Sequence, residues 1–410
     1  MAVTTNEQSS DLSTQGGRWQ CGILLVIILL VLRIPFWNHP TPVHPDELAF
    51  VAGIGFPVQY PVHPPGYPLW VLLGTLLTYT GVSAYTAYQV WSVLASILAP
   101  LLLFSGLRWL LNRGIAFWLA LGFGVNPLVW FQSTVALTYL PATVIGLLVV
   151  GLCHQALVRE CGTRLLWAGV LLSFGLLLRS DLLIYLGPLF AYVAWRRRRQ
   201  GGLRSMIILM LGCLMLYMLT LYLYSRNEGD SAGDRLAHTR DLILATSVFR
   251  LGLADGLLRN LIKIAINVTW DFGLGTILLF PSLWICWRNR LRNPHLSTLL
   301  LLWLLPGGLF LLLMHVVQGY FMLLVPAGYV IVGLALQARC KPNTALRIAA
   351  LTTLASASQF IFYPWSGESS GFKRLLDAKI AFQSASGLRH IDQRKKIHRQ
   401  GDYWPTRAHE

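Results

Sequence analysis

Long runs of apolar residues, separated by short polar stretches, recur along nearly the whole chain. A helix rises about 1.5 Å per residue, so ~20 apolar residues cross the ~30 Å hydrocarbon core of a bilayer. Lipid offers the backbone no hydrogen bonds, so such runs must be helices. The pattern predicts an all-α integral membrane protein, a polytopic bundle of about eleven transmembrane helices. The predicted spans begin near Cys21, Ala84, Gly114, Ala142, Leu165, Leu182, Leu203, Phe272, Leu296, Tyr320 and Ala345.

The polar stretches divide the chain into three parts. Residues 1–20 are rich in Ser, Thr and Gln and are expected to be disordered and cytoplasmic, and residues 364–410 form a short polar, basic tail. The transmembrane module between them, residues 21–363, has a first outer loop at 38–83 and a longer outer loop at 225–271. Within the first loop, an apolar run near Tyr67 is too short to span and is expected to lie on the membrane surface.

Composition and charge narrow the class of protein further. The 410 residues are 55% hydrophobic with a mean hydropathy of +0.56, which excludes an ordinary soluble domain. The net charge of +16 would suit a nucleic-acid partner, but no soluble basic domain is visible. The basic residues instead stand at helix ends, where membrane topology places them. We therefore expect membrane lipids as partners and no nucleic acid.

The distribution of these basic residues also predicts the topology. With the N-terminus inside, Arg-rich turns fall on the cytoplasmic side and the short outer turns carry little besides Arg179, as the positive-inside rule requires. The first loop then faces the periplasm or exterior, most simply at a bacterial inner membrane. An odd number of spans places the basic tail outside, although long segments follow the rule weakly. The predicted inner turns carry Arg108, Arg113, Arg159, Arg164, Arg196 to Arg199, Arg204, Arg288, Arg290, Arg292, Arg339 and Lys341.

Candidate chemistry gathers in the first outer loop, which has no Lys or Arg between residues 38 and 68. Asp46 and Glu47 are adjacent acids there, and a carboxylate beside apolar surface can accept a proton from a hydroxyl. His44 and His63 could complete a divalent metal site with Asp46 or Glu47. The simplest alternative is a helix N-terminus, which acidic residues stabilise. A divalent metal ion is thus left open, and no other cofactor is expected.

Two later turns add polar residues at the predicted outer face. Arg179 and Asp181 stand between two apolar helices, either as a structural ion pair or with Arg179 binding a phosphate through its planar fork. His315, Gln318 and Tyr320 form another outer turn, in which a histidine can contact a phosphate or simply be solvated.

A third polar pattern precedes the eighth predicted span. Lys263, Asn267 and Asp271 follow one another at four-residue spacing and so share one helical face. An amphipathic helix on the outer surface explains this face, and a polar wall of the site is the alternative.

Together these motifs resemble the GT-C superfamily of integral-membrane glycosyltransferases, most closely a subgroup related to protein O-mannosyltransferases. The resemblance runs through the acidic pair Asp46-Glu47, the His63 to Tyr67 element, the stretch Asn126 to Ser133, Arg179 and the segment His315 to Pro326. One departure stands out, since no large soluble insert follows in a late outer loop.

The resemblance implies a GT-C-like fold with a catalytic first outer loop and a polyprenyl-phosphate-linked monosaccharide, of hexosyl or mannosyl type, as donor. Asp46, with Glu47, would deprotonate an acceptor hydroxyl on a lipid, glycan or protein, and direct displacement would invert the sugar. A transporter or lipid flippase is the alternative, but it would need ionisable residues at mid-membrane. The expected substrate-binding residues are His44, His63, Tyr67, Arg179, Asp181, His315, Gln318 and Tyr320.

Overall fold

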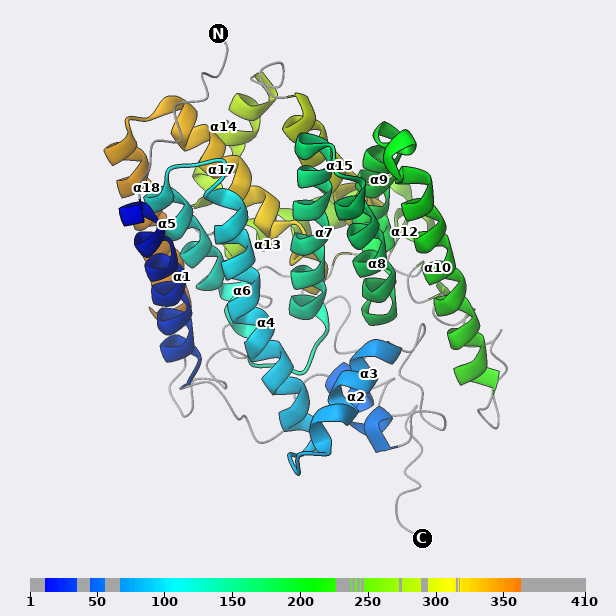
Figure 1. Ribbon diagram of the computed structural model, residues 1–410. Coiled ribbons are helices and arrows are strands. Elements are labelled where there is room, and N and C mark those ends of the chain that lie inside the picture. Colours follow the sequence, from blue (N-terminus) through cyan, green and yellow to red (C-terminus); the bar gives the residue numbers. More distant parts are fainter. Residues whose placement is uncertain are drawn as a thin grey trace.

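The computed structural model describes residues 12–34, 45–55, 67–225, 247–272, 275–288, 294–314, 316 and 318–362, with a few single positions between 237 and 244. All regular elements among these residues are helices, as the hydrophobic pattern predicts (Figure 1). In chain order they are α1 (Leu12–Arg33), α2 (Pro45–Gly55), α3 (Pro68–Thr78), α4 (Ala84–Leu107), α5 (Arg113–Gly124), α6 (Pro127–Gln132), α7 (Tyr139–Arg159), α8 (Gly162–Leu178), α9 (Leu182–Arg196), η2 (Arg198–Gln200), α10 (Gly202–Ser225), α12 (Val248–Leu251), α13 (Leu253–Phe272), α14 (Gly275–Arg288), α15 (Pro294–Leu313), α16 (Gln318–Phe321), α17 (Val325–Arg339) and α18 (Pro342–Phe362).

Eleven of these helices correspond to the predicted spans, although Tyr320, the predicted start of the tenth, lies in α16 and α17 begins only at Val325. By length and composition α4, α7, α15 and the part of α10 up to Tyr222 can each cross a membrane, and shorter apolar helices accompany them. The first helix differs from the expectation, because α1 begins at Leu12, within the stretch expected to be disordered. The helices that match the predicted spans are α1, α4, α5, α7, α8, α9, α10, α14, α15, α17 and α18.

The surface of the bundle suits lipid. On α10 large apolar side chains stand exposed on one side of the helix, such as Leu203, Met210 and Leu214. A soluble protein rarely leaves such a continuous apolar face open to water. The described helices therefore form an all-α polytopic membrane fold.

The bundle has two chemically different ends. Most helices run side by side, while α2 and α3 lie across one end of the bundle, next to α4 and α8 (Figure 1). We name this the acidic end, because α2 begins there with Asp46 and Glu47. The opposite end is the basic end, where η2 joins α9 to α10 and residues 196–199 are four consecutive arginines.

The break between α5 and α6 follows directly from the sequence. Asn126 caps α6 by accepting a hydrogen bond from the N–H of Leu128 at 2.9 Å, and Pro127 occupies the first turn. Pro127 has no N–H to donate to the preceding turn, and its ring clashes with that turn. A continuous helix through this position is therefore disfavoured, and α5 ends at Gly124. The break between the two helices brings the chain into the interior near the acidic end, where every residue of α6 is buried.

An aromatic cluster attaches α2 and α3 to the bundle. Trp70 stacks on Tyr88 of α4 with ring centroids 4.8 Å apart, and Phe50 of α2 meets Tyr67 edge-to-face at 5.4 Å. Close approach requires Gly74, since a Cβ there would lie 2.5 Å from the Tyr88 ring. Burial of these rings fixes the position of α2 and of the acids at its start.

Candidate active site

The two adjacent acids at the start of α2 have different surroundings. Both lie in the first turn of the helix, where exposed backbone N–H groups favour negative charge. Glu47 is fully buried, whereas Asp46 is partly exposed. The helix N-terminus read from the sequence is therefore present, but it does not account for both carboxylates in the same way.

Glu47 ties α2 to the segment between α6 and α7. Its Oε1 accepts a hydrogen bond from the backbone N–H of Ala136 at 2.6 Å and lies 3.4 Å from the hydroxyl of Tyr85. A buried carboxylate needs such partners, because an unpaired charge in the interior is costly. Glu47 thereby fixes the segment that leads to Thr138 and Tyr139.

Asp46 faces the start of α7. It lies close enough to Tyr139, the first residue of that helix, for the two side chains to interact electrostatically. The two adjacent acids thus have different places: Glu47 is anchored in the interior, and Asp46 lies partly exposed at the acidic end.

Arg179 lies between α8 and α9 in a nearly closed setting. Its Nε and Nη2 donate to the two carboxylate oxygens of Asp181 at 2.9 and 2.7 Å, and Nη1 donates to the hydroxyl of Thr138 at 3.0 Å. The guanidinium carbon stands 4.1 Å from the ring centre of Tyr139 and 5.1 Å from that of Tyr320. Two-pronged pairing and cation–π contact both fix the orientation of the guanidinium.

Tyr67 completes this group from the N-cap of α3. Its backbone is left-handed, with φ of 47°, which is uncommon for a non-glycine residue and costs conformational energy. Burial raises the pKa of its hydroxyl well above the usual value, and Arg179 opposes that shift. The Arg179 cluster, as we define it, consists of Thr138, Tyr139, Arg179, Asp181, Tyr320 and Tyr67.

The structure brings together five of the residues expected from the sequence. Asp46 and four members of the Arg179 cluster meet at the acidic end, although they come from widely separated parts of the chain. His44, His63 and His315 lie outside the described residues, and Gln318 is described only as the start of α16. The four cluster members expected from the sequence are Tyr67, Arg179, Asp181 and Tyr320.

Two hydrogen-bond partners in this site could not be predicted from the sequence. Thr138 and the backbone N–H of Ala136 carry no recognisable signal, because neither residue type is distinctive in an apolar context. One clue existed in the buried polar run Ser133-Thr134 directly before them, within a stretch otherwise rich in apolar residues.

The described residues alone do not make a metal site. In the part of the chain that the structure describes, no three His, Cys, Asp or Glu side chains come together so as to hold an ion. Glu47 directs Oε1 at Ala136 inside the protein. The metal site predicted from the sequence includes His44 and His63, which fall outside the described residues.

The polar face of α13 turns toward the protein. Asn267 and Asp271 are buried on it, and Asn260 donates a hydrogen bond to the carbonyl of Leu312 at 2.8 Å. Apolar side chains such as Leu258 stand exposed on the same helix. The shared face predicted from the sequence is thus present, and it faces inward. Among the residues that the structure describes, none forms a hydrogen bond with the carboxylate oxygens of Asp271.

This chain resembles known proteins in structure rather than in sequence. No protein-family model and no curated protein matches this chain. Solved structures do match, at low sequence identity. ArnT from Cupriavidus metallidurans, bound to undecaprenyl phosphate, is 14% identical with a TM-score of 0.58, over 92% of this chain and 72% of that one.

Two further neighbours are larger proteins. The oligosaccharyltransferase of Archaeoglobus fulgidus is 13% identical with a TM-score of 0.53, and the match covers 95% of this chain and 60% of that one. The arabinosyltransferase EmbB of Mycobacterium smegmatis is 11% identical with a TM-score of 0.51, over 95% of this chain and 42% of that one. This chain thus spans well under two thirds of either protein.

These neighbours share one architecture. Each match extends over more than nine tenths of this chain. The all-α polytopic fold is therefore shared with these three proteins, and the GT-C-like fold that the sequence resemblance implies is confirmed.

Proposed function

We propose that this protein is a membrane glycosyltransferase that moves a monosaccharide from a polyprenyl-phosphate carrier to an acceptor hydroxyl at its acidic end. One observation carries the proposal: Asp46 and Arg179 both interact electrostatically with Tyr139, so a carboxylate and a guanidinium lie near one another at the acidic end. The GT-C fold supports it, as does the neighbour ArnT, whose structure contains undecaprenyl phosphate.

The donor phosphate would bind beside Arg179. Hydrogen bonds to Asp181 and Thr138 occupy three of the five N–H groups of the guanidinium, and the hydroxyls of Tyr139 and Tyr320 lie within reach of it. A phosphate would bind by replacing these neutral hydroxyl partners. Asp181 holds the planar fork in place before the donor arrives, so little orientational freedom is lost on binding. The apolar carrier chain would remain in the bilayer, against the exposed apolar surfaces of the helices.

Asp46 would act as the general base. It takes the proton of the acceptor hydroxyl while that oxygen attacks C1 of the sugar. The bond between C1 and the phosphate oxygen breaks, and polyprenyl phosphate leaves with the electron pair. Arg179 stabilises the negative charge that develops on the departing phosphate. A single displacement of this kind inverts the anomeric centre.

Other residues would position Asp46 and Arg179. Glu47 acts through its hydrogen bond to Ala136, which holds the approach to Tyr139. Tyr67 and Tyr320 would line the sugar. His44, His63, His315 and Gln318 stay in the proposal as substrate contacts. A divalent ion, if the reaction uses one, would be bound by Asp46 with His44 or His63.

The charge distribution supports the orientation. The basic end would face the cytoplasm, so Asp46 would face the periplasm or exterior, most simply at a bacterial inner membrane. A hexose donor of mannosyl type and an acceptor on a lipid, glycan or protein follow from the sequence resemblance.

The function can be tested in cells. In a strain that lacks this protein, polyprenyl-phosphate-linked sugar should accumulate and one glycan or glycolipid should lose a sugar, as measured by mass spectrometry. Wild-type protein should reverse both effects, and Asp46→Asn should reverse neither. An unchanged lipid and glycan profile in the strain without the protein would make the glycosyltransferase proposal wrong. Restoration of the normal profile by Asp46→Asn would rule out Asp46 as the base.

A transporter or lipid flippase is the second candidate, and one observation favours it. Asp271 is a buried carboxylate on an inward polar face, and no residue in the described part of the chain forms a hydrogen bond with its oxygens. Buried ionisable groups of this kind mark ion or substrate paths in membrane proteins. A transporter would depend on Asp271 and tolerate Asp46→Asn. The proposed glycosyltransferase would instead depend on Asp46 and tolerate Asp271→Asn.

A further inference from the structure

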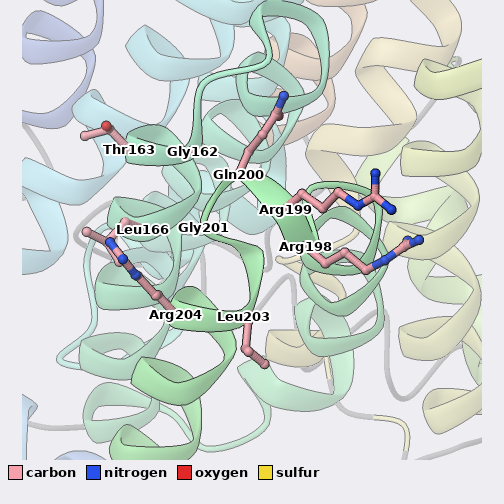
Figure 2. A pocket seen from close by; sticks show the side chains of 9 residues that line it. All are labelled: Gly162, Thr163, Leu166, Arg198, Arg199, Gln200, Gly201, Leu203 and Arg204. Carbon is pink, nitrogen blue, oxygen red and sulfur yellow. The ribbon is translucent and has the colours of Figure 1, made fainter.

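A pocket opens at the basic end, far from the site described above. Its volume is about 590 Å³, and it lies where the start of α8 meets η2 and the start of α10. Figure 2 shows Arg198 and Arg199 extending on one side and Arg204 on the other, next to Leu166. The residues that line it are Gly162, Thr163, Leu166, Arg198, Arg199, Gln200, Gly201, Leu203 and Arg204.

The three lining arginines carry uncompensated charge. Among the described residues the nearby acid Glu160 pairs with Arg197 at 2.8 Å, outside the lining. None of the three lining arginines has a carboxylate partner in the described part of the chain. Arg198 stands over the ring of the exposed Trp195, with 4.8 Å from the guanidinium carbon to the ring centre. The pocket therefore presents three positive charges beside an interfacial aromatic residue.

The backbone around the pocket adds to its positive electrostatic potential. Both α8 and α10 begin at the pocket, so their positive dipole ends point to it. The floor is backbone packed on backbone, since a Cβ on Gly162 would lie 1.8 Å from the carbonyl oxygen of Gln200. A glycine is thus required there for the turn to lie against α8.

The surroundings are amphipathic, which distinguishes a lipid from a soluble anion. Leu203, at the rim, begins an exposed apolar strip on α10 that continues through Ile207, Met210 and Leu214. A ligand whose phosphate sits between the arginines could lay its hydrocarbon chains along this strip. A soluble phosphate would use the charges and leave the strip unused.

We propose that this pocket is a binding site for the phosphate headgroup of an anionic glycerophospholipid of the inner leaflet. Basic pockets between helices on the cytoplasmic side bind such headgroups in other membrane proteins. The site is separate from the proposed active site, and its occupation would stabilise the α8–α10 pair from the cytoplasmic side. It does not depend on glycosyl transfer.

The test uses full-length protein in phosphatidylcholine nanodiscs, with phosphatidylglycerol added. Wild-type protein should gain thermal stability and retain phosphatidylglycerol in native mass spectrometry. Substitution of the three lining arginines by glutamine should weaken apparent affinity roughly tenfold or more. The matched control replaces Arg288, Arg339 and Arg347, at the same end, by glutamine and should behave as wild type. Equal loss in the control would overturn the proposal, because general surface charge would then explain binding.

A second variant keeps the test valid if the triple substitution fails to fold. Thr163→Glu places an acid in the first turn of α8, which a helix N-terminus tolerates, yet it should repel the phosphate. Undiminished phosphatidylglycerol retention by this variant would contradict the site. Competition by inorganic phosphate with equal affinity would indicate a soluble ligand, and preference for polyprenyl phosphate would indicate the carrier; either result would overturn the assignment.

Discussion

Glu47 accepts a hydrogen bond from the backbone N–H of Ala136, 2.6 Å away in space and 89 residues along the chain. The bond joins the first turn of α2 to the segment that delivers Thr138 and Tyr139 to Arg179. The sequence suggests that Glu47 belongs to a catalytic pair. In the structure its carboxylate instead connects α2 to the segment that carries Thr138 and Tyr139.

The first prediction concerns this hydrogen bond between Glu47 and Ala136. Glu47→Ala should lower the free energy of unfolding by about 1–3 kcal/mol, because it leaves the Ala136 N–H buried without an acceptor. Glu47→Gln should cost less, since an amide oxygen can accept the same bond. Thermal unfolding in detergent measures both. An alanine variant as stable as wild type would show that the bond does not hold the site.

The second prediction concerns Asp46. Asp46→Asn removes the proposed base but keeps the size of the side chain, so turnover should fall roughly 10²–10⁴-fold. Donor binding and thermal stability should change little, because Asp46 is partly exposed at the start of α2. Steady-state transfer with a purified polyprenyl-phosphate-sugar gives turnover. Normal turnover would rule out the proposed base.

The third prediction concerns Arg179. Arg179→Lys keeps the charge but loses the two-pronged bond to Asp181, so donor affinity should weaken by about tenfold while turnover at saturation changes less. Equilibrium binding of the carrier phosphate is the readout. Asp181→Asn is the control, because it weakens the same ion pair and leaves the guanidinium in place. If both variants lose stability but bind donor normally, Arg179 is only structural.

The spans and the acidic loop could be predicted because they depend on local pattern. A run of apolar residues must form a helix in lipid whatever surrounds it, so the predicted start at Ala84 coincides with the first residue of α4. Pro127 likewise ends α5 through the geometry of its own ring. These features need no knowledge of distant residues.

The roles inside the site could not be predicted, because they arise from contacts across the chain. Nothing local distinguishes the buried Glu47 from Asp46, and only the position of Ala136 separates them. The same holds for α13, where four-residue spacing defines the polar face but not the direction in which it points. In the structure, buried Asn267 and Asp271 face the protein, while apolar side chains such as Leu258 are exposed.

The fourth prediction tests the orientation with a native thiol. Cys161, at the start of α8 on the basic end, has a pKa lowered by the backbone N–H of Arg164, so its reactive thiolate persists to lower pH than that of an ordinary cysteine. A membrane-impermeant maleimide should label it in inside-out vesicles and spare it in intact cells. A single cysteine introduced at Asp46 should show the reverse. Labelling of Cys161 from outside would overturn the topology.

The last prediction decides between the two candidate functions through Asp271. Burial raises the pKa of this carboxyl well above its usual value, so the folded state favours the protonated form. The stabilising effect of that proton is complete below the unfolded-state pKa and is lost as pH rises toward the folded-state pKa. Asp271→Asn does not titrate, so it should be at least as stable as wild type, with an advantage that grows with rising pH. Asn267→Asp, which adds a carboxylate one turn earlier, should instead destabilise. Melting temperatures across neutral pH measure all three proteins. A less stable Asp271→Asn variant would mean that Asp271 binds a cation in the folded protein, and would favour the transporter.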